Sequence, residues 1–142
     1  MNVSAELLEE LVAHVCEDPA NEVCGLVAVE GDLPAASAAR NAVRVYRARN
    51  LHRSPLRFEI DPKELLQLSN AIEEHGWEIG AIYHSHVRSP PYPSQTDVNF
   101  AAKWPGVEWI IVGLAGVEAP QVRSYMIEDG EVEEVPLGET AM

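Results

Sequence analysis

The stretch from Ile79 to Asp97, IGAIYHSHVRSPPYPSQTD, carries the strongest structural signal in this chain. Its apolar start predicts a strand over Ile79–His84 that runs on into Ser85 and His86. Side chains two residues apart leave the same face of a strand, so the rings of His84 and His86 can point to one place. Such a pair indicates a candidate metal site, although an isolated H-x-H is more often two ordinary exposed or core histidines.

The segment after this strand can bring an acidic side chain back to the two histidines. Val87–Pro93 is predicted to be a proline-rich loop, and Thr96–Lys103 a short helix with Asp97 just inside it. The prolines stiffen the loop and lower the entropy that is lost in fixing it. Two histidines, one carboxylate and an open fourth position form a known ligand set for catalytic zinc. His84, His86 and Asp97 are therefore the candidate ligands.

Two further side chains are candidates for catalysis, and each has a simpler explanation. Ser94 precedes Asp97 by three residues, so its hydroxyl could donate a hydrogen bond to an oxyanion near the metal, or it could only cap the helix. Zinc chemistry also needs a base for water, and Glu22 stands at the entrance of an apolar strand, where a side chain can face a cleft. Taken alone, Glu22 is more simply interpreted as another surface acid.

The rest of the sequence predicts an α/β fold in one domain, residues 1–142. One helix is expected between Ser4 and Asp18, and another between Asp61-Pro62 and Gly76. Asn50–Arg57 is expected to be an exposed loop. The remaining expected strands are Val23–Val29, its antiparallel neighbour Ala42–Arg49, a short one at Phe58–Ile60, Val107–Leu114, and a hairpin of Val122–Ile127 and Val132–Val135. Helices interleaved with strands, some of them hairpin-joined, favour an α/β/α sandwich with a mixed sheet.

Charge and cysteine usage narrow the class of protein. The chain has 10 basic and 23 acidic residues and a net charge of −13, which disfavours nucleic acid and anionic membranes as partners. Solubility is the simplest reason for this acidity, and a salt-rich cytoplasm is the alternative. Cys16 and Cys24 lie in apolar patterns and are predicted to be buried thiols. His14 and His75 are predicted to be solvated on helices. A cytoplasmic, soluble protein is expected.

Together the motifs resemble the JAMM (MPN-plus) zinc metallopeptidases over nearly the whole chain. The pattern consists of His84-Ser85-His86, seven residues, Ser94-Gln95-Thr96-Asp97, and Glu22-Val23-Cys24-Gly25 upstream. The resemblance implies that His84, His86 and Asp97 bind one catalytic Zn²⁺. It also implies that Glu22 accepts a proton from the water that the zinc activates, and that Ser94 steadies the oxyanion. The implied fold is a cytidine-deaminase-like α/β/α sandwich. Base deamination is excluded, because the H-x-E and P-C-x-x-C signatures of zinc deaminases are missing.

The resemblance also suggests a substrate class. Family members mostly cleave peptide or isopeptide bonds after the Gly-Gly tail of ubiquitin-like proteins. No histidine or cysteine follows Asp97, which argues against the second zinc site that eukaryotic deubiquitinating members often carry. The chain looks most like the stand-alone prokaryotic type that releases cysteine from a sulfur-carrier protein, so a β-grasp carrier is the expected partner. The alternatives are a non-catalytic MPN scaffold, and a zinc amidase for a small molecule or cell-wall peptide.

Overall fold

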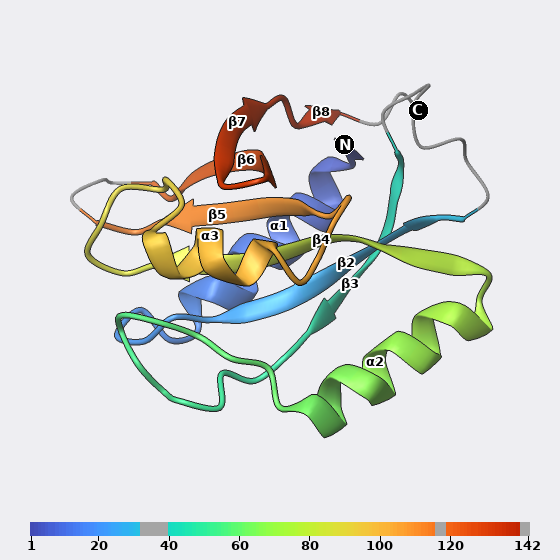
Figure 1. The fold of residues 1–142 in the computed structure, drawn as a ribbon, viewed down its shortest axis with the longest axis horizontal. Helices are drawn as coiled ribbons and strands as arrows, with labels where there is room; N and C mark the ends of the chain where they lie inside the picture. The colour runs from blue at the N-terminus through green and yellow to red at the C-terminus, as the bar shows by residue number, and fades with distance from the viewer. Residues whose placement is uncertain (32–39, 116–118, 140–142) are drawn as a thin grey trace.

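A six-stranded sheet forms the centre of the fold and has helices on both faces (Figure 1). The computed structural model describes residues 1–31, 40–115 and 119–139. In chain order the elements are β1 (Asn2–Val3), α1 (Ala5–Cys16), β2 (Cys24–Glu30), β3 (Ala42–Arg47), α2 (Pro62–Glu74), β4 (Trp77–His86), α3 (Gln95–Ala101), β5 (Glu108–Gly113), β6 (Gln121–Glu128), β7 (Glu131–Val135) and β8 (Gly138–Glu139).

The sheet is mixed, as expected from the sequence. Its strand order is β3-β2-β4-β5-β6-β7, and β4 and β5 are the parallel pair, whereas the other neighbours run antiparallel. β1 and β8 form a separate parallel pair. Leu11 and Val15 of α1 pack on one face of the large sheet, and Ile72 of α2 and Ala101 of α3 pack on the other. The predicted α/β/α sandwich is therefore confirmed.

Local sequence fixes where the helices begin. The Ser4 hydroxyl accepts a hydrogen bond from the Leu7 backbone N–H and caps α1. Asp61 caps α2, and Pro62 occupies the first helical position, where its missing N–H costs nothing. No helix among the described residues combines the length and apolar character needed to cross a membrane.

The strand that carries the two histidines is longer than the sequence suggested. β4 begins at Trp77, directly after the left-handed turn residue Gly76 (φ 75°), and pairs with β2 from its first residue. At its other end the parallel register with β5 continues through Ser85 to His86. Both histidines therefore lie inside a central strand that has a neighbour on each side, and this makes their backbone positions rigid.

One prediction for the 50–60 region was wrong, and another was confirmed with one exception. Phe58–Ile60 is not a strand, because only Ile60 pairs, in an isolated bridge with Asn50. The predicted exposed loop at 50–57 is confirmed for most of its residues, such as Leu51 and Leu56, but Asn50 is buried. Its side-chain oxygen accepts hydrogen bonds from the N–H groups of His52 and Glu59, which organises this segment without a sheet.

The predictions for the cysteines and helical histidines are partly corrected. Cys24 is buried as expected, but Cys16 at the end of α1 is exposed. His75 is exposed, whereas His14 is buried and its Nδ1 lies 2.6 Å from the Tyr83 hydroxyl. The partner lies on β4, far away in the sequence, so no local pattern indicated it.

Gly25 gives a testable prediction about packing. It faces Tyr83 across the β2–β4 pair, and a Cβ at position 25 would overlap the Tyr83 ring. Because Tyr83 is fully buried and hydrogen-bonded to His14, its ring has little room to move. We expect Gly25→Ala to lower the free energy of unfolding by about 1–3 kcal/mol, measured by urea denaturation.

A smaller side chain opposite Gly25 provides the control for this substitution. In a Tyr83→Leu background, Gly25→Ala should cost less than it does in the parent, since the ring is gone. An unchanged urea midpoint for Gly25→Ala in the parent chain would show that the sheet accommodates the methyl group.

Candidate metal centre

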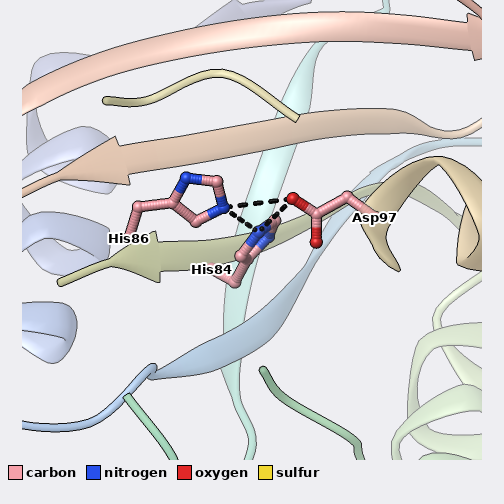
Figure 2. A group of neighbouring side chains, drawn as sticks. All are labelled: His84, His86 and Asp97. Carbon is pink, nitrogen blue, oxygen red and sulfur yellow. Dashed lines mark hydrogen bonds and ion pairs between the residues drawn. The ribbon is translucent and has the colours of Figure 1, made fainter. Parts of the chain in front are cut away.

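The end of β4 presents two imidazole rings to the face of the sheet that carries α2 and α3. His84 lies opposite Ile111 of β5 and opposite Cys24 of β2, and His86 lies opposite Gly113. Because the two histidines are two residues apart in one strand, they leave the same face, as the sequence predicted. Figure 2 shows both rings with Asp97, which comes from the start of α3.

The three predicted ligands meet at one point (Figure 2). Nε2 of His84 lies 3.1 Å from Nε2 of His86 and 3.2 Å from Oδ2 of Asp97. Nε2 of His86 lies 3.1 Å from the same Oδ2. The exposed fractions are 0% for His84, 3% for His86 and 3% for Asp97, so the site is closed from most of the solvent. The structure thus brings together the H-x-H pair and the aspartate.

Neighbouring backbone groups orient two of these ligands. Nδ1 of His86 donates a hydrogen bond to the Pro90 carbonyl at 2.9 Å, which leaves the lone pair of its Nε2 facing the other ligands. The Ser94 backbone N–H donates to Oδ2 of Asp97 at 2.9 Å, and the Ser94 hydroxyl accepts from the Asp97 N–H at 3.2 Å. This reciprocal capping box fixes the carboxylate and starts α3. The proline loop therefore places the histidine ring as well as the helix.

The donor set fits a small divalent cation. Tetrahedral zinc, with bonds of about 2.0–2.1 Å to nitrogen or oxygen, would place its ligand atoms roughly 3.3 Å apart, close to the spacing found here. Hydrogen bonding alone satisfies the cluster poorly, because three electron-pair donors share so small a space. Nδ1 of His84 is buried and has no hydrogen-bond partner among the described residues. A cation bound to the three inward-facing atoms would give the cluster the positive charge that it lacks.

The electrostatics of the cluster keep two of the three candidate ligands, Asp97 and His84, in the state that metals bind. Burial by itself would raise the pKa of Asp97, but His84 beside it and hydrogen bonds from both histidines hold that pKa well below its ordinary value. Burial lowers the pKa of His84 in spite of the opposing charge of Asp97. At His86 burial lowers the pKa, but hydrogen bonds to Asp97 and to the Pro90 carbonyl outweigh burial and raise it. Asp97 is therefore an anion and His84 a neutral base at physiological pH, as coordination requires.

An aromatic side chain that no sequence motif singled out supports the first candidate ligand. The ring of Phe58 stacks on His84 with a centroid separation of 4.5 Å, and Trp109 meets the same imidazole edge-on at 6.2 Å. These rings exclude water from the back of His84 and limit its rotation. Phe58 belongs to an irregular segment, and its contact with a distant strand has no signature in the local sequence.

Glu22 lies next to the cluster, just before β2 begins. Ser85 pairs with Val23 through a backbone hydrogen bond of 3.0 Å, and continuing this register places Glu22 opposite His86. The side chain of Glu22 is buried, with an exposed fraction of 6%. Burial raises the pKa of Glu22 to about 8, the charge of His86 opposes this rise, and the charge of Asp97 adds to it. A carboxyl group with a pKa near neutrality can accept a proton and return it.

The family relationship follows from comparison of the chain with known proteins. Residues 4–128 match the family described as prokaryotic homologs of the JAB domain, and the matched region contains all five candidate residues. This chain belongs to the prokaryotic JAB-domain family. The JAMM (MPN-plus) resemblance of the sequence is thereby confirmed. His84, His86 and Asp97 of its motif form a group that could hold a metal ion.

Curated relatives of this JAB-domain chain include a peptidase, a desampylase and a probable protease by name. The CysO-cysteine peptidase of Mycobacterium bovis is 34% identical over 137 residues, which cover 95% of this chain and 88% of that protein. The desampylase of Haloferax volcanii is 33% identical over 121 residues, covering 82% of both chains. A probable TtuB-protein conjugate cleaving protease of Thermus thermophilus is 35% identical over 126 residues, covering 88% of this chain and 74% of that protein.

Solved structures share the fold of this JAB-domain chain. Protein DSY2949 from Desulfitobacterium hafniense superposes with a TM-score of 0.82 at 31% identity, covering 98% of this chain and 93% of that one. A JAB1/MPN domain protein from Archaeoglobus fulgidus has a TM-score of 0.60 at 18% identity, covering 99% of this chain and 100% of that one, and this likeness concerns the fold alone.

Proposed function

We propose that this chain is a zinc-dependent peptidase that cleaves the bond after the C-terminal Gly-Gly tail of a ubiquitin-like or sulfur-carrier protein, for example to release cysteine from a carrier–cysteine adduct. The observation that carries the proposal is the convergence of His84, His86 and Asp97 with the buried Glu22 beside them. The peptidase relatives support the reaction class. We propose residues 1–142 as one JAMM metallopeptidase domain.

The cluster would bind one Zn²⁺ through the three inward-facing atoms of His84, His86 and Asp97. When bound, zinc supplies a Lewis acid that polarises the amide carbonyl and acidifies the attacking water. The protein contributes ligands held by a rigid strand and a capped helix, so little rearrangement is needed when the charge develops. The rings of Phe58 and Trp109 keep the back of the site dry.

Glu22 would move the proton. Its carboxylate accepts a proton from the attacking water as the water oxygen bonds to the carbonyl carbon of the last glycine. The carbon–nitrogen bond then breaks, and Glu22 delivers the same proton to the leaving amine. The products are the carrier with a free Gly-Gly carboxylate and the released amine. Because one group both receives and returns the proton, Glu22 has to lie within reach of the water and of the leaving nitrogen.

Ser94 would stabilise the oxyanion while it caps α3. Its hydroxyl oxygen accepts from the Asp97 N–H, so the hydroxyl hydrogen is free to donate elsewhere. We expect Ser94→Ala to lower kcat by about tenfold to a hundredfold. Oxyanion donors can contribute more than this, but the effect should be smaller here because Ser94 is exposed. The same change should cost about 1 kcal/mol of stability through the lost cap.

A glycine at position 94 separates the two roles of the serine. Glycine is a tolerated cap, so Ser94→Gly should cost only a few tenths of a kcal/mol of stability and still lose the same factor in kcat. Urea denaturation gives the stability, and saturation kinetics give kcat and KM. Equal kcat values for Ser94→Gly and the parent would show that Ser94 caps α3 and does not stabilise the oxyanion.

Direct assay of the zinc-loaded protein tests the function. The substrates are a β-grasp carrier extended by cysteine after its Gly-Gly tail, the same carrier joined to a lysine side chain, and a small amide. We expect mass spectrometry to show carrier with a free Gly-Gly end from at least one conjugate, and no turnover of the small amide. A zinc-bound protein that cleaves neither conjugate would overturn the proposal and favour a scaffold.

The proposed setting is the cytoplasm. Cys16 and Cys24 are both free thiols, although Cys16 is exposed, and such usage suits a reducing compartment. The proposed partner is the β-grasp carrier. An extended Gly-Gly tail can lie along an exposed strand and leaves room only for small residues near the metal.

A further inference from the structure

Glu22 borders a second space besides the metal cluster. A cavity of about 350 Å³ lies next to it, and its walls come from the end of α1, the approach to β2 and the segment that follows β3. His14 and Asn50 are its other buried polar wall residues, and Arg49 and Arg53 are exposed wall residues. The cavity is thus polar and open, and it is lined by the residue to which we assign the proton transfer.

Both acidic and basic side chains line this cavity. Of its acidic wall residues, Glu17 pairs with Arg47, and Asp18 accepts hydrogen bonds from the Ala20 N–H and the Asn21 amide. Among the described residues, Arg49 and Arg53 form no ion pair. Two arginines without an ion pair among the described residues therefore line a cavity next to the proposed base.

Hydrogen bonds connect Glu22 to the segment that carries Arg53. The Glu22 N–H donates to the Ser54 carbonyl at 2.8 Å, and the Asn50 side-chain amide donates to the Glu22 carbonyl at 3.0 Å. Arg53, between them, has a left-handed backbone with φ 46°, a conformation that costs a non-glycine residue about 1 kcal/mol or more. The 50–54 segment thus holds Arg53 and Glu22 in a fixed relation.

The proposed mechanism determines what occupies this space. Glu22 must deliver its proton to the leaving amine, so the leaving group lies against Glu22. We propose that the cavity beside Glu22 receives the leaving amino acid and that Arg49 and Arg53 bind its α-carboxylate. This inference rests on the proposed function and makes it more specific. In an adduct joined through an α-amine, the carboxylate is two bonds from the leaving nitrogen, whereas a lysine side chain offers no charge at that position.

Three substrates and four variants, one of them a control, test the carboxylate site. The zinc-loaded parent is assayed on a carrier joined after Gly-Gly to cysteine, to cysteinamide and to a lysine side chain. Cysteinamide has the same shape as cysteine without the negative charge. We expect kcat/KM to be about tenfold higher for cysteine than for cysteinamide, because charge-assisted hydrogen bonds are stronger than neutral ones. The lysine conjugate should resemble cysteinamide or be slower.

The variants show which side chains bind the α-carboxylate of the leaving cysteine. Arg49→Ala combined with Arg53→Ala should bring the cysteine-to-cysteinamide ratio close to one, and each single change should lower it in part. Arg44→Ala is the matched control, since Arg44 is an exposed arginine without an ion pair in the described residues and lies outside this cavity. Thermal melts verify that each variant is folded.

The possible outcomes are separable. A parent ratio near one, or a ratio that the double variant leaves unchanged, overturns the carboxylate site while the peptidase proposal stands. Failure of the zinc-bound parent to cleave any of the three conjugates overturns both. A ratio that falls only in the arginine variants of the cavity, and not in Arg44→Ala, supports the assignment.

Discussion

Glu22→Gln should remove nearly all turnover while the metal stays bound. Glutamine has the shape of glutamate but cannot accept the proton of the attacking water, so kcat should fall by about 10²- to 10⁴-fold. Zinc affinity should change little, because Glu22 is not among the proposed ligands His84, His86 and Asp97. Zinc content is measured by elemental analysis and kcat by saturation kinetics on the carrier–cysteine adduct.

Glu30→Gln is the control for this substitution, because it makes the same chemical change at the exposed far end of β2. It should cleave at the parent rate. If Glu22→Gln also cleaved at that rate, the assignment of the base would be wrong, and another group would have to move the proton. Loss of zinc in Glu22→Gln would instead place this carboxyl among the ligands.

A pH series on the metal-free protein checks the environment of Glu22 independently of activity. The folded carboxyl holds its proton up to a pKa of about 8, against an ordinary value of 4.5. Between these values the folded state binds more protons than the unfolded state, so the contribution of Glu22 to stability falls as the pH rises. Glu22→Gln should remove this part of the decline, as followed by the urea midpoint.

His84→Ala should lose the metal and the activity together. His84 is fully buried, supplies one of three ligand atoms and stacks on Phe58, so its removal eliminates a ligand and leaves a cavity. We expect stoichiometric zinc in the parent and none in the variant, with no detectable cleavage. The unfolding free energy of the metal-free variant should lie about 2–4 kcal/mol below that of the metal-free parent.

Melting curves with and without zinc separate loss of the ligand from loss of the fold. Zinc at a hundredfold excess over its dissociation constant should stabilise the parent by about 2.7 kcal/mol and leave His84→Ala unchanged. His75→Ala, which removes an exposed histidine that contacts Trp77, should bind zinc as the parent does. Full zinc occupancy in a folded His84→Ala protein would contradict the assigned ligand set.

The sequence predicted most of the metal cluster because the relevant geometry is local. The period of two in a strand aligns His84 with His86, and the capping pattern of Ser94 with Asp97 starts the helix that carries the carboxylate. A short, proline-rich loop joins the strand that carries the histidines to the helix that carries the carboxylate, so the two elements are close along the chain. A local pattern can therefore predict a site whose parts are neighbours in sequence.

The features that the sequence did not predict depend on contacts between distant segments. His14 is buried by Tyr83 of β4, and Phe58 is placed by its stacking on His84. Asn50 looked like an ordinary loop residue, yet its amide bonds four backbone groups and connects the 50–59 segment to Glu22. The prediction that Cys16 is buried was wrong because this residue ends α1, where an apolar pattern no longer ensures that the rest of the protein buries the side chain.

The seven-residue length of α3 has a consequence for hydrogen exchange. Isolated helices shorter than about 12–15 residues are marginal in water, so α3 depends on what holds it to the sheet. Asp97 lies in its first turn and shares its Oδ2 with the histidines of β4, so a cation there would cross-link the helix to the central strand. Removing that cation should let the amides of α3 exchange by local opening, while those of β4 stay protected by both neighbouring strands.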